Sequence, residues 1–451
     1  MDKKRKKRFK WNISQTQYLA YGFLAIILAG ALLLMLPFSS KDGQSENFIN
    51  CLFTATSATC VTGLVVRDTW TQWTLFGQIV IMTLIQIGGL GFVTVGVFIS
   101  IVLRRKIGLK ERGLLQESVN TLQIGGVVRL AKRIIKGTFL FESAGAILLS
   151  IRFVPQFGIL RGVFYGIFHS VSAFCNAGFD LMGHIEPYNS FVSYYDDWLV
   201  NLVIMSLIII GGIGFIVWDD IYKNRLHFNK YMLHTKIVLV TTSTLVFGGG
   251  LLFYLLEKNN LLVGMNVSGQ ILTSLFSSVT ARTAGFNTTD TRALTDGSKL
   301  LTIILMFIGG SPGSTAGGIK TTTLFVLLMC VHSNIKKSYG VNVFGRRLQE
   351  DAVKRAGTIL TINLFLALAA SLAIMANQSL GFSDILFETF SAIGTVGMTT
   401  GITRDLNTFS RVVIILLMYC GRIGSLSFAL AFVQNHKIAH VEQPAEAINV
   451  G

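Results

Sequence analysis

One short phrase of sequence occurs four times in this chain, at intervals of about 110 residues. Each copy begins with a hydrophobic residue and Phe, runs through Ser, Thr and other small residues, and ends with a glycine and its neighbours. The copies are residues 52–66 (LFTATSATCVTGLVV), 167–181 (IFHSVSAFCNAGFDL), 275–289 (LFSSVTARTAGFNTT) and 386–400 (LFETFSAIGTVGMTT). Repetition at a fixed period indicates repeated structural units. We therefore expect four equivalent units, which we divide as residues 1–103, 104–222, 223–335 and 336–451.

The composition indicates that these units lie in a lipid bilayer. Hydrophobic residues make up 51% of the chain and charged residues only 14%, and the mean hydropathy is +0.58. These values are too apolar for a soluble chain of 451 residues. The five cysteines are odd in number and scattered through apolar stretches, so they indicate neither a disulfide framework nor a zinc site.

The net charge of +16 is concentrated between the units. The chain starts with the basic segment MDKKRKKRFK, and further Lys and Arg residues gather at 104–112, 129–136, 223–236 and 336–355. Positive loops stay on the cytoplasmic side of a membrane, so this pattern places both ends of every unit, and both termini, in the cytoplasm. It argues against a nucleic-acid partner, because the charge flanks apolar spans. The spans predicted from apolar runs are residues 11–40, 69–103, 137–154, 198–218, 237–256, 300–335, 356–377 and 408–434.

The repeated phrase lies between the two spans of each unit and is too short and too rich in Ser and Thr to cross the bilayer as a helix. Because both spans end inside, the phrase must leave the outer face and return to it as a re-entrant loop. Irregular backbone at membrane depth is tolerated where it is buried in protein or lines an aqueous cavity. The predicted fold is therefore an all-α polytopic membrane protein with eight spans, in which four re-entrant loops surround one central pore.

The phrases contain no carboxylate, histidine or cysteine at a position matched in all four copies, which argues against a divalent or transition metal site. They share a short helix-forming stretch followed by a glycine, and glycine can turn consecutive carbonyls toward one axis. Rings of backbone carbonyls suit a monovalent cation. Close helix packing is an alternative explanation for the glycines, but it does not explain four matched copies. The predicted filter consists of Cys60, Val61, Thr62, Gly63, Asn176, Ala177, Gly178, Thr283, Ala284, Gly285, Thr395, Val396 and Gly397.

The second spans carry a repeat of their own, with GGLGF at 88–92, GGIGF at 211–215, and glycines at the equivalent places in the other copies, Gly309 and Gly421. We interpret these as points of close helix approach. In the third copy the sequence becomes GGSPGSTAGGIKTTT, which cannot sustain a helix. We expect this span to break into a flexible loop without regular hydrogen bonding that acts as a gate. The predicted gate consists of Gly309, Gly310, Ser311, Pro312, Gly313, Ser314, Thr315, Ala316, Gly317, Gly318 and Arg422.

Two residues near this loop carry charge. Arg422 lies inside the last apolar span, and an intramembrane arginine usually faces a cavity or a partner. A purely structural pairing with a buried carboxylate is the alternative. Lys320 is expected to reach the cytoplasmic interface. The spacing from Gly313 to Gly318 imitates a phosphate-binding loop, but Ile319 stands where that motif requires lysine.

Together, the phrases CVTG (60–63), NAGF (176–179), TAGFNT (283–288) and GTVGMT (394–399), within four span-loop-span units, resemble the Trk/Ktr/HKT superfamily of potassium transporters. The resemblance covers essentially the whole chain and is greatest to the membrane subunit of bacterial Ktr systems. It implies K⁺ as the transported ion, Na⁺ as a possible activator, no covalently bound cofactor and no enzymatic activity. It also implies a homodimer in the bacterial plasma membrane and a cytosolic nucleotide-binding regulatory ring. Glycine at all four filter positions favours potassium in that superfamily.

Two other classes of function remain as alternatives. A coupled secondary transporter could bind a small organic or anionic solute at the broken helix. A structural or receptor membrane protein has only the general apolarity in its favour. Residues 1–451 contain no G-x-G-x-x-G motif in a soluble unit, so we expect any control by nucleotides to come from another protein.

Overall fold

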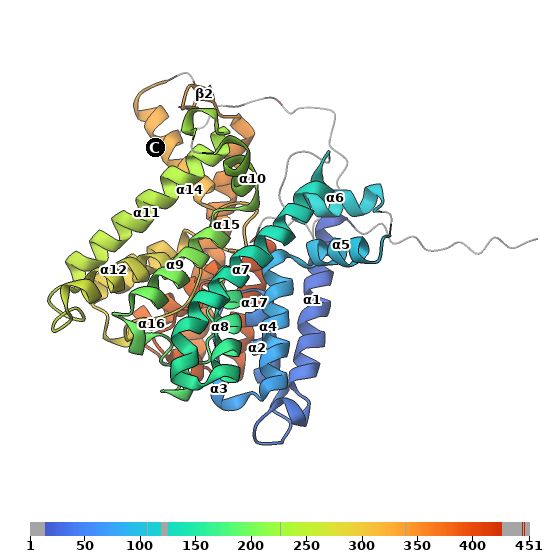
Figure 1. The fold of residues 1–451 in the computed structure, drawn as a ribbon. Helices are drawn as coiled ribbons and strands as arrows, with labels where there is room; N and C mark the ends of the chain where they lie inside the picture. Colours follow the sequence, from blue (N-terminus) through green and yellow to red (C-terminus); the bar gives the residue numbers. More distant parts are fainter. Residues whose placement is uncertain are drawn as a thin grey trace, which may run out of the picture.

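The computed structural model describes residues 14–105, 107–118, 125–225, 227–338 and 340–425, together with residues 444 and 446. These residues are mainly helical, and the helices follow one order in the four copies (Figure 1). Each copy has a long helix, a shorter helix formed by the repeated phrase, which we call the phrase helix, and a third helix. In the first three copies a further helix follows the third one, and in the fourth the residues from 426 onward lie outside the continuous described part of the chain.

The helices of the first two copies are α1 (Gln15–Leu34), α2 (Phe48–Thr59), α3 (Thr69–Gln72), α4 (Leu75–Leu90), α5 (Phe92–Val102), α7 (Val127–Phe157), α8 (Ile159–Phe174), α9 (Trp198–Gly212) and α10 (Phe215–Asn224). Those of the last two are α11 (Leu233–Glu257), α12 (Val267–Ala281), α13 (Asp296–Phe307), α14 (Thr321–Ile335), α15 (Glu350–Asn377), α16 (Phe382–Gly394) and α17 (Thr408–Ile423). The phrase helices are therefore α2, α8, α12 and α16, and the helices that we call third are α4, α9, α13 and α17; the four-residue helix α3 precedes α4 in the first copy.

Shorter elements connect the copies. Helix α6 (Leu109–Ser118) lies between the first and second, and an antiparallel pair, β1 (Asn342–Val343) and β2 (Arg346–Arg347), lies between the third and fourth. Single turns of 3₁₀ helix are η1 (Pro37–Ser39), η2 (Met182–His184), η3 (Val192–Tyr194), η4 (Phe228–Lys230), η5 (Thr291–Ala293) and η6 (Ile402–Arg404).

The third helix of every copy starts with the same local structure. Its N-cap side chain accepts a hydrogen bond from the backbone N–H three residues later, which satisfies one of the unpaired donors of the first turn. The caps are Thr74, Asp197, Thr295 and Asn407. The sequence therefore sets the start of this helix independently in each copy.

The copies form a closed circle. Within each copy the long helix packs against the phrase helix, as in α1 with α2 and α7 with α8. Between copies the third helix packs against the phrase helix of the next copy: α4 on α8, α9 on α12, α13 on α16, and finally α17 on α2. The last contact returns to the first copy, so the four phrase helices occupy the centre of the molecule.

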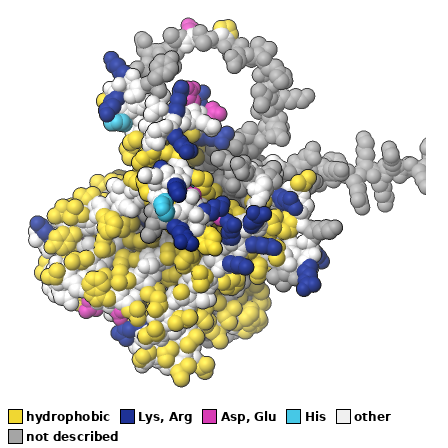
Figure 2. Space-filling view, turned by 45° about the horizontal axis from the view of Figure 1, so that its top comes forward, with side chains coloured by type: hydrophobic (Ala, Val, Ile, Leu, Met, Phe, Trp, Pro, Cys, Tyr) yellow, Lys and Arg dark blue, Asp and Glu magenta, His cyan; other side chains and the backbone are white. Residues whose placement is uncertain are grey.

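Polar and apolar side chains are distributed as a bilayer requires. The phrase helices bury their Ser and Thr residues almost completely, whereas the long helices expose large apolar side chains such as Leu140, Phe247 and Phe365. In Figure 2 hydrophobic side chains cover the broad body of the molecule, and Lys and Arg gather toward the end that carries α6 and α10. This arrangement suits lipid around the body and water at the basic end.

Four helices, α1, α7, α11 and α15, are each long and apolar enough to cross a membrane, and the number is six if the pairs α4–α5 and α9–α10 each count as one span. In the third and fourth copies, α13, α14 and α17 are each shorter than the length needed to cross a membrane alone. Residues 426–434 of the last predicted span lie outside the described part of the chain. The predicted total of eight spans therefore stays a prediction.

Two of the predicted spans are not continuous. Between α4 and α5 the axis turns by 95°, and between α9 and α10 it turns by 97°, so that α5 lies across the end of α4 in Figure 1. Both turns occur at a glycine with positive φ, Gly91 at 80° and Gly214 at 99°, which is backbone geometry that other residues rarely adopt. The predicted spans 69–103 and 198–218 are therefore each bent, and a break is not confined to the third copy.

Candidate functional site

The four glycines of the phrases lie edge to edge in a closed ring. A β-carbon added to Gly63 would lie 2.5 Å from the carbonyl oxygen of Ala177, directly before the next glycine. The same contact joins Gly178 to Ala284, Gly285 to Val396, and Gly397 back to Thr62. All four glycines have positive φ, from 70° to 94°. No side chain fits at any of these positions, which we call the ring glycines.

The backbone before the ring has one form in three copies and another in the third. In copies one, two and four, a left-handed residue lies two positions before the ring glycine: Val61, Asn176 and Thr395. The following amides of Thr62, Ala177 and Val396 then donate to carbonyls five residues earlier, at 2.8 to 2.9 Å. In the third copy the phrase is one residue shorter between Phe276 and Gly285. The amide of Ala284 there donates to Thr280 at 2.9 Å, as in an ordinary helical turn.

One buried hydroxyl in each phrase helix fixes the backbone at or just after the ring. In the first and fourth copies the hydroxyls of Ser57 and Ser391 accept hydrogen bonds from the amides of Gly63 and Gly397, both at 3.0 Å. The other two copies reverse the direction. Ser172 and Thr280 donate to the carbonyls of Phe179 and Phe286, at 2.7 and 2.8 Å. The sequence analysis did not predict this role, although a Ser or Thr four residues after the repeated Phe of each phrase is a visible signal for it.

The residue after the repeated Phe supports the chain beyond the ring in two copies. His169 is fully buried, contacts the carbonyl of Tyr165 through Nδ1 at 2.7 Å and accepts from the amide of Leu181 through Nε2 at 3.0 Å. In the fourth copy Glu388 accepts from the hydroxyls of Thr399 and Thr403, both at 2.6 Å. These residues hold the backbone that follows the ring. The sequence analysis did not predict a functional role for them.

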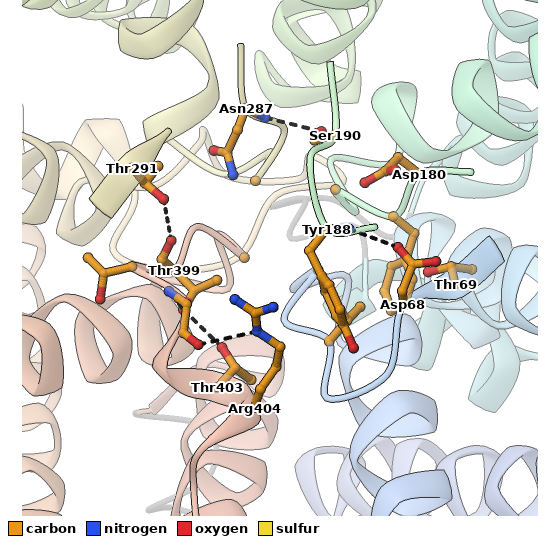
Figure 3. Close-up of a pocket in the computed structure, with 18 of the residues that line it drawn as sticks. Asp68, Thr69, Asp180, Tyr188, Ser190, Asn287, Thr291, Thr399, Thr403 and Arg404 are labelled. Carbon is orange, nitrogen blue, oxygen red and sulfur yellow. Dashed lines mark hydrogen bonds between the residues drawn. The ribbon is translucent and has the colours of Figure 1, made fainter. Parts of the chain in front are cut away.

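A cavity of about 110 Å³, which we call the ring cavity, lies against all four ring glycines. Segments from all four copies surround it in Figure 3. Hydrogen bonds between copies tie these segments together: the amide of Tyr188 donates to Asp68 at 3.1 Å, and that of Asn287 to Ser190 at 3.2 Å. Between the last two copies, the hydroxyl of Thr291 donates to the carbonyl of Thr399 at 2.5 Å.

The segment 308–320 separates α13 from α14 and contains the ten consecutive predicted gate residues. Thr315 fixes it to the second copy, because its amide donates to Gly211 at 3.2 Å and its hydroxyl donates to the carbonyl of Phe174 at 3.0 Å. The side-chain amide of Asn176, next to the ring, donates through Nδ2 to the same hydroxyl at 2.8 Å. As expected, the loop forms no helix or strand, but individual hydrogen bonds fix it to the second copy.

Two cations also bind the loop. The guanidinium of Arg422 donates to the carbonyl of Thr315 and to the carbonyls of Gly88 and Gly89 at the end of α4. Lys320 folds back, and its ammonium group donates to the carbonyls of Ala316 at 2.7 Å and Gly317 at 3.1 Å. The expectation that Lys320 reaches the cytoplasmic interface is wrong, because loop carbonyls without helical partners attract its charge.

Gly317 lies directly against Thr395 of the fourth phrase, since a β-carbon there would meet the threonine side chain. On its other side the loop borders a second cavity of about 490 Å³, lined by Gly313, Ala316, Lys320 and Arg422 among others. We call this the loop cavity. The loop thus lies between the ring and the loop cavity.

The predicted filter and gate residues therefore come together in two adjoining layers. Within the described ranges, no group of three or more His, Cys, Asp or Glu side chains could hold a metal ion. The contacts that close the ring are made by backbone carbonyls, whereas charged side chains, among them Asp68, Asp180 and Arg404, line the ring cavity beside it. Carbonyl oxygens suit a monovalent cation that exchanges its hydration shell for protein oxygens.

The TrkH family, described as a cation transport protein, matches residues 2–443 of the chain. The chain belongs to this family. It is also similar to individual TrkH-family relatives along nearly its full length. It is 41% identical to the potassium/sodium uptake protein NtpJ of Enterococcus hirae, with 99% of each chain covered. It is 44% identical to the Ktr system potassium uptake protein B of Bacillus subtilis, with 96% of each chain covered.

A solved TrkH-family structure has the same fold. The potassium transporter TrkH from Vibrio parahaemolyticus superposes with a TM-score of 0.74, covering 95% of this chain and 87% of the other. The identity between the two is 19%, so this comparison concerns the fold alone. Together with the apolar surface, membership of the TrkH family makes the chain a multi-pass membrane protein.

The hydroxyl of Ser57 gives a test of the ring. Replacing Ser57 with Ala leaves the buried amide of Gly63 without a partner, so we expect Ser57→Ala to lower the free energy of unfolding by about 1–3 kcal/mol. Ser100→Ala is the matched control, because the Ser100 hydroxyl lies at the surface and bonds the carbonyl of Gly96 in the preceding turn; its effect should stay within about 0.5 kcal/mol. Thermal unfolding in detergent measures both. Equal losses of stability would contradict a special role of Ser57.

Proposed function

We propose that the chain carries K⁺ into the cell, and that its selectivity filter is formed by backbone carbonyls of residues 60–63, 176–178, 283–285 and 395–397. The closed ring of four glycines carries this proposal. Its geometry brings one carbonyl from each copy to a common level without any side chain between them. Carbonyl rings of this kind replace the hydration shell of K⁺. The names of the relatives, which are potassium and potassium/sodium uptake proteins, agree with this cargo.

The direction of the phrase helices supports a cation at the ring. Each phrase helix ends three or four residues before its ring glycine, at Thr59, Phe174, Ala281 and Gly394. The carboxyl end of a helix carries roughly half an elementary negative charge. Four such ends near one axis attract a cation to the ring. Na⁺, which the name of one relative includes, is the second cation to be tested as cargo or activator.

The loop and Arg422 are proposed as the gate. Arg422 makes its hydrogen bonds to carbonyls, and no ion pair among residues 14–425 that the structure describes includes it. It bridges the loop in the third copy to α4 in the first. Opening the path from the ring to the loop cavity requires these bonds to break. The loop is less suited to binding an organic solute, because the second copy and the two cations occupy its polar groups.

Control of the gate is assigned to a cytosolic partner. The relatives named as Ktr system proteins imply a membrane subunit that works with other components. We propose a homodimer in the bacterial plasma membrane above a nucleotide-binding ring, with both termini in the cytoplasm. The basic end of the molecule, which carries α6 and α10 in Figure 1 and many Lys and Arg side chains in Figure 2, is the surface on which that ring would dock.

The filter is tested by Gly63→Ser. The added side chain meets the carbonyl of Ala177 in a backbone conformation with φ of 94°, so the ring must distort. We expect the ratio of K⁺ to Na⁺ uptake to fall by about tenfold, which corresponds to a loss of about 1.4 kcal/mol in discrimination. Uptake is measured in cells deficient in potassium uptake. Gly248→Ser in α11 is the control, because its β-carbon would meet nothing within 4 Å. An unchanged ratio in Gly63→Ser argues against the filter.

The orientation is tested by labelling single cysteines with an impermeant reagent on intact cells. Lys230→Cys lies at the basic end, beyond α10, and should react only after the membrane is permeabilised. Asp42→Cys lies in the exposed connection between α1 and α2 and should react from outside. Strong external labelling at position 230 would overturn the orientation and, with it, the re-entrant path of the phrases.

The gate is tested by Arg422→Gln and by deletion of residues 310–317. Arg422→Gln removes the bonds from the guanidinium to the loop and to α4, and the deletion removes most of the loop itself. We expect basal K⁺ flux into proteoliposomes to rise several-fold, since each charge-assisted bond lost contributes about 1.5–3 kcal/mol. Dependence on the cytosolic partner should weaken while the ratio of K⁺ to Na⁺ stays the same. Arg152→Gln, which breaks the ion pair with Asp197, is the control. Wild-type flux and full partner dependence in both gate variants would assign the gate elsewhere.

A further inference from the structure

The C-terminal caps of the four phrase helices differ in charge. These caps are Cys60, Cys175, Arg282 and Thr395. Only the third is an ionised side chain. The third copy thus places a permanent cation where the other copies have small neutral groups.

Arg282 is buried without a counter-charge. Its side chain is 5% exposed, and its Nε and Nη1 atoms have no hydrogen-bond partner. None of the ion pairs found in the described residues includes it. An unpaired buried charge destabilises a fold, so stability alone does not account for an arginine at this position.

The position of Arg282 links it to the ring. It lies three residues before Gly285, and three residues of backbone span at most about 11 Å. The phrase is also shortened by one residue between Thr280 and Gly285, the stretch that contains Arg282. The backbone therefore keeps the Cα atom of Arg282 within about 11 Å of that of Gly285, and the burial of the side chain keeps its charge inside the protein.

We propose that Arg282 acts as a fixed positive charge that lowers the affinity of the ring for monovalent cations. Its charge more than cancels the roughly half negative charge at the end of α12, so three phrase helices rather than four attract the ion. At about 10 Å and an effective dielectric constant of about 20, one unit charge weakens cation binding by about tenfold. Weaker binding lets an ion leave the ring, which conduction requires. This inference rests on the proposed function.

The test compares Arg282→Gln, Arg282→Met and Arg282→Lys in the purified full-length protein. Equilibrium binding of K⁺ and of Na⁺ is measured by calorimetry and by the ion dependence of the thermal unfolding midpoint. Both neutral variants should bind K⁺ about tenfold more tightly, and the lysine variant should bind like the wild type. Because the charge acts on both ions, the ratio of K⁺ to Na⁺ affinity should not change. Arg161→Gln is the matched control, since Arg161 is an exposed residue in the first turn of another phrase helix, α8.

The outcomes separate this inference from the proposed function. If the wild type binds K⁺, and Gly63→Ser alters the ratio of K⁺ to Na⁺, but the neutral Arg282 variants bind K⁺ with wild-type affinity, Arg282 has no role in ion affinity and the inference fails alone. If the wild type shows no binding of K⁺ or Na⁺, the filter fails and the inference fails with it. If neither neutral variant folds while the lysine variant does, the charge serves the fold and the inference is likewise overturned.

Discussion

The contact between each ring glycine and the carbonyl that precedes the next one is the constraint on which the structure depends. The ring of contacts is closed, because Gly397 contacts Thr62, the residue before Gly63. A side chain added at any one of the four glycines would therefore collide with the backbone of the neighbouring copy and displace it. Four backbones can approach so closely only where there is no β-carbon and where φ is positive. The cyclic packing of each third helix on the next phrase helix holds the four loops at this distance. The Ser and Thr hydroxyls then fix the backbone at and after the glycines.

A bilayer imposes the second constraint, since backbone polar groups inside it must find partners in the protein. The loop between α13 and α14 meets this demand without a helix. Thr315 and Ser311 bond to the carbonyls at the end of α9 and α8, and Arg422 and Lys320 supply donors to carbonyls that a helix would have paired internally. A loop held by side chains can be released by moving them, whereas an intact helix cannot. The break between α13 and α14 leaves carbonyls without helical partners, and Arg422 and Lys320 supply the donors that these carbonyls need.

The sequence predicts four features of the structure, because each depends on local composition. These are the repeat, the membrane class, the helical stretch before each ring glycine and the interruption at 309–318. The bends after Gly91 and Gly214 were not readable, since an apolar run looks the same straight or bent and the sign of φ depends on tertiary contacts. The hydroxyl of Ser57 accepts while that of Ser172 donates, and this difference depends on where the chain lies after the ring. Lys320 was misplaced because sequence alone does not reveal the unpaired carbonyls beside it.

The departures from fourfold symmetry concentrate in the third copy. Its phrase is one residue shorter and the C-cap of its phrase helix is Arg282. Thirteen residues, 308–320, separate α13 from α14, whereas one residue separates α4 from α5 and two separate α9 from α10. The closed ring explains this concentration. All four copies must place a glycine in the ring, so the ring itself must be symmetric. The backbone that precedes the ring in each copy can differ, provided that it holds the glycine in this position. A shortened phrase still does so, because Ala284 closes an ordinary helical turn where the other copies use a left-handed residue. One copy is therefore free to carry both the charge beside the ring and the loop beneath it, while the other three maintain the geometry.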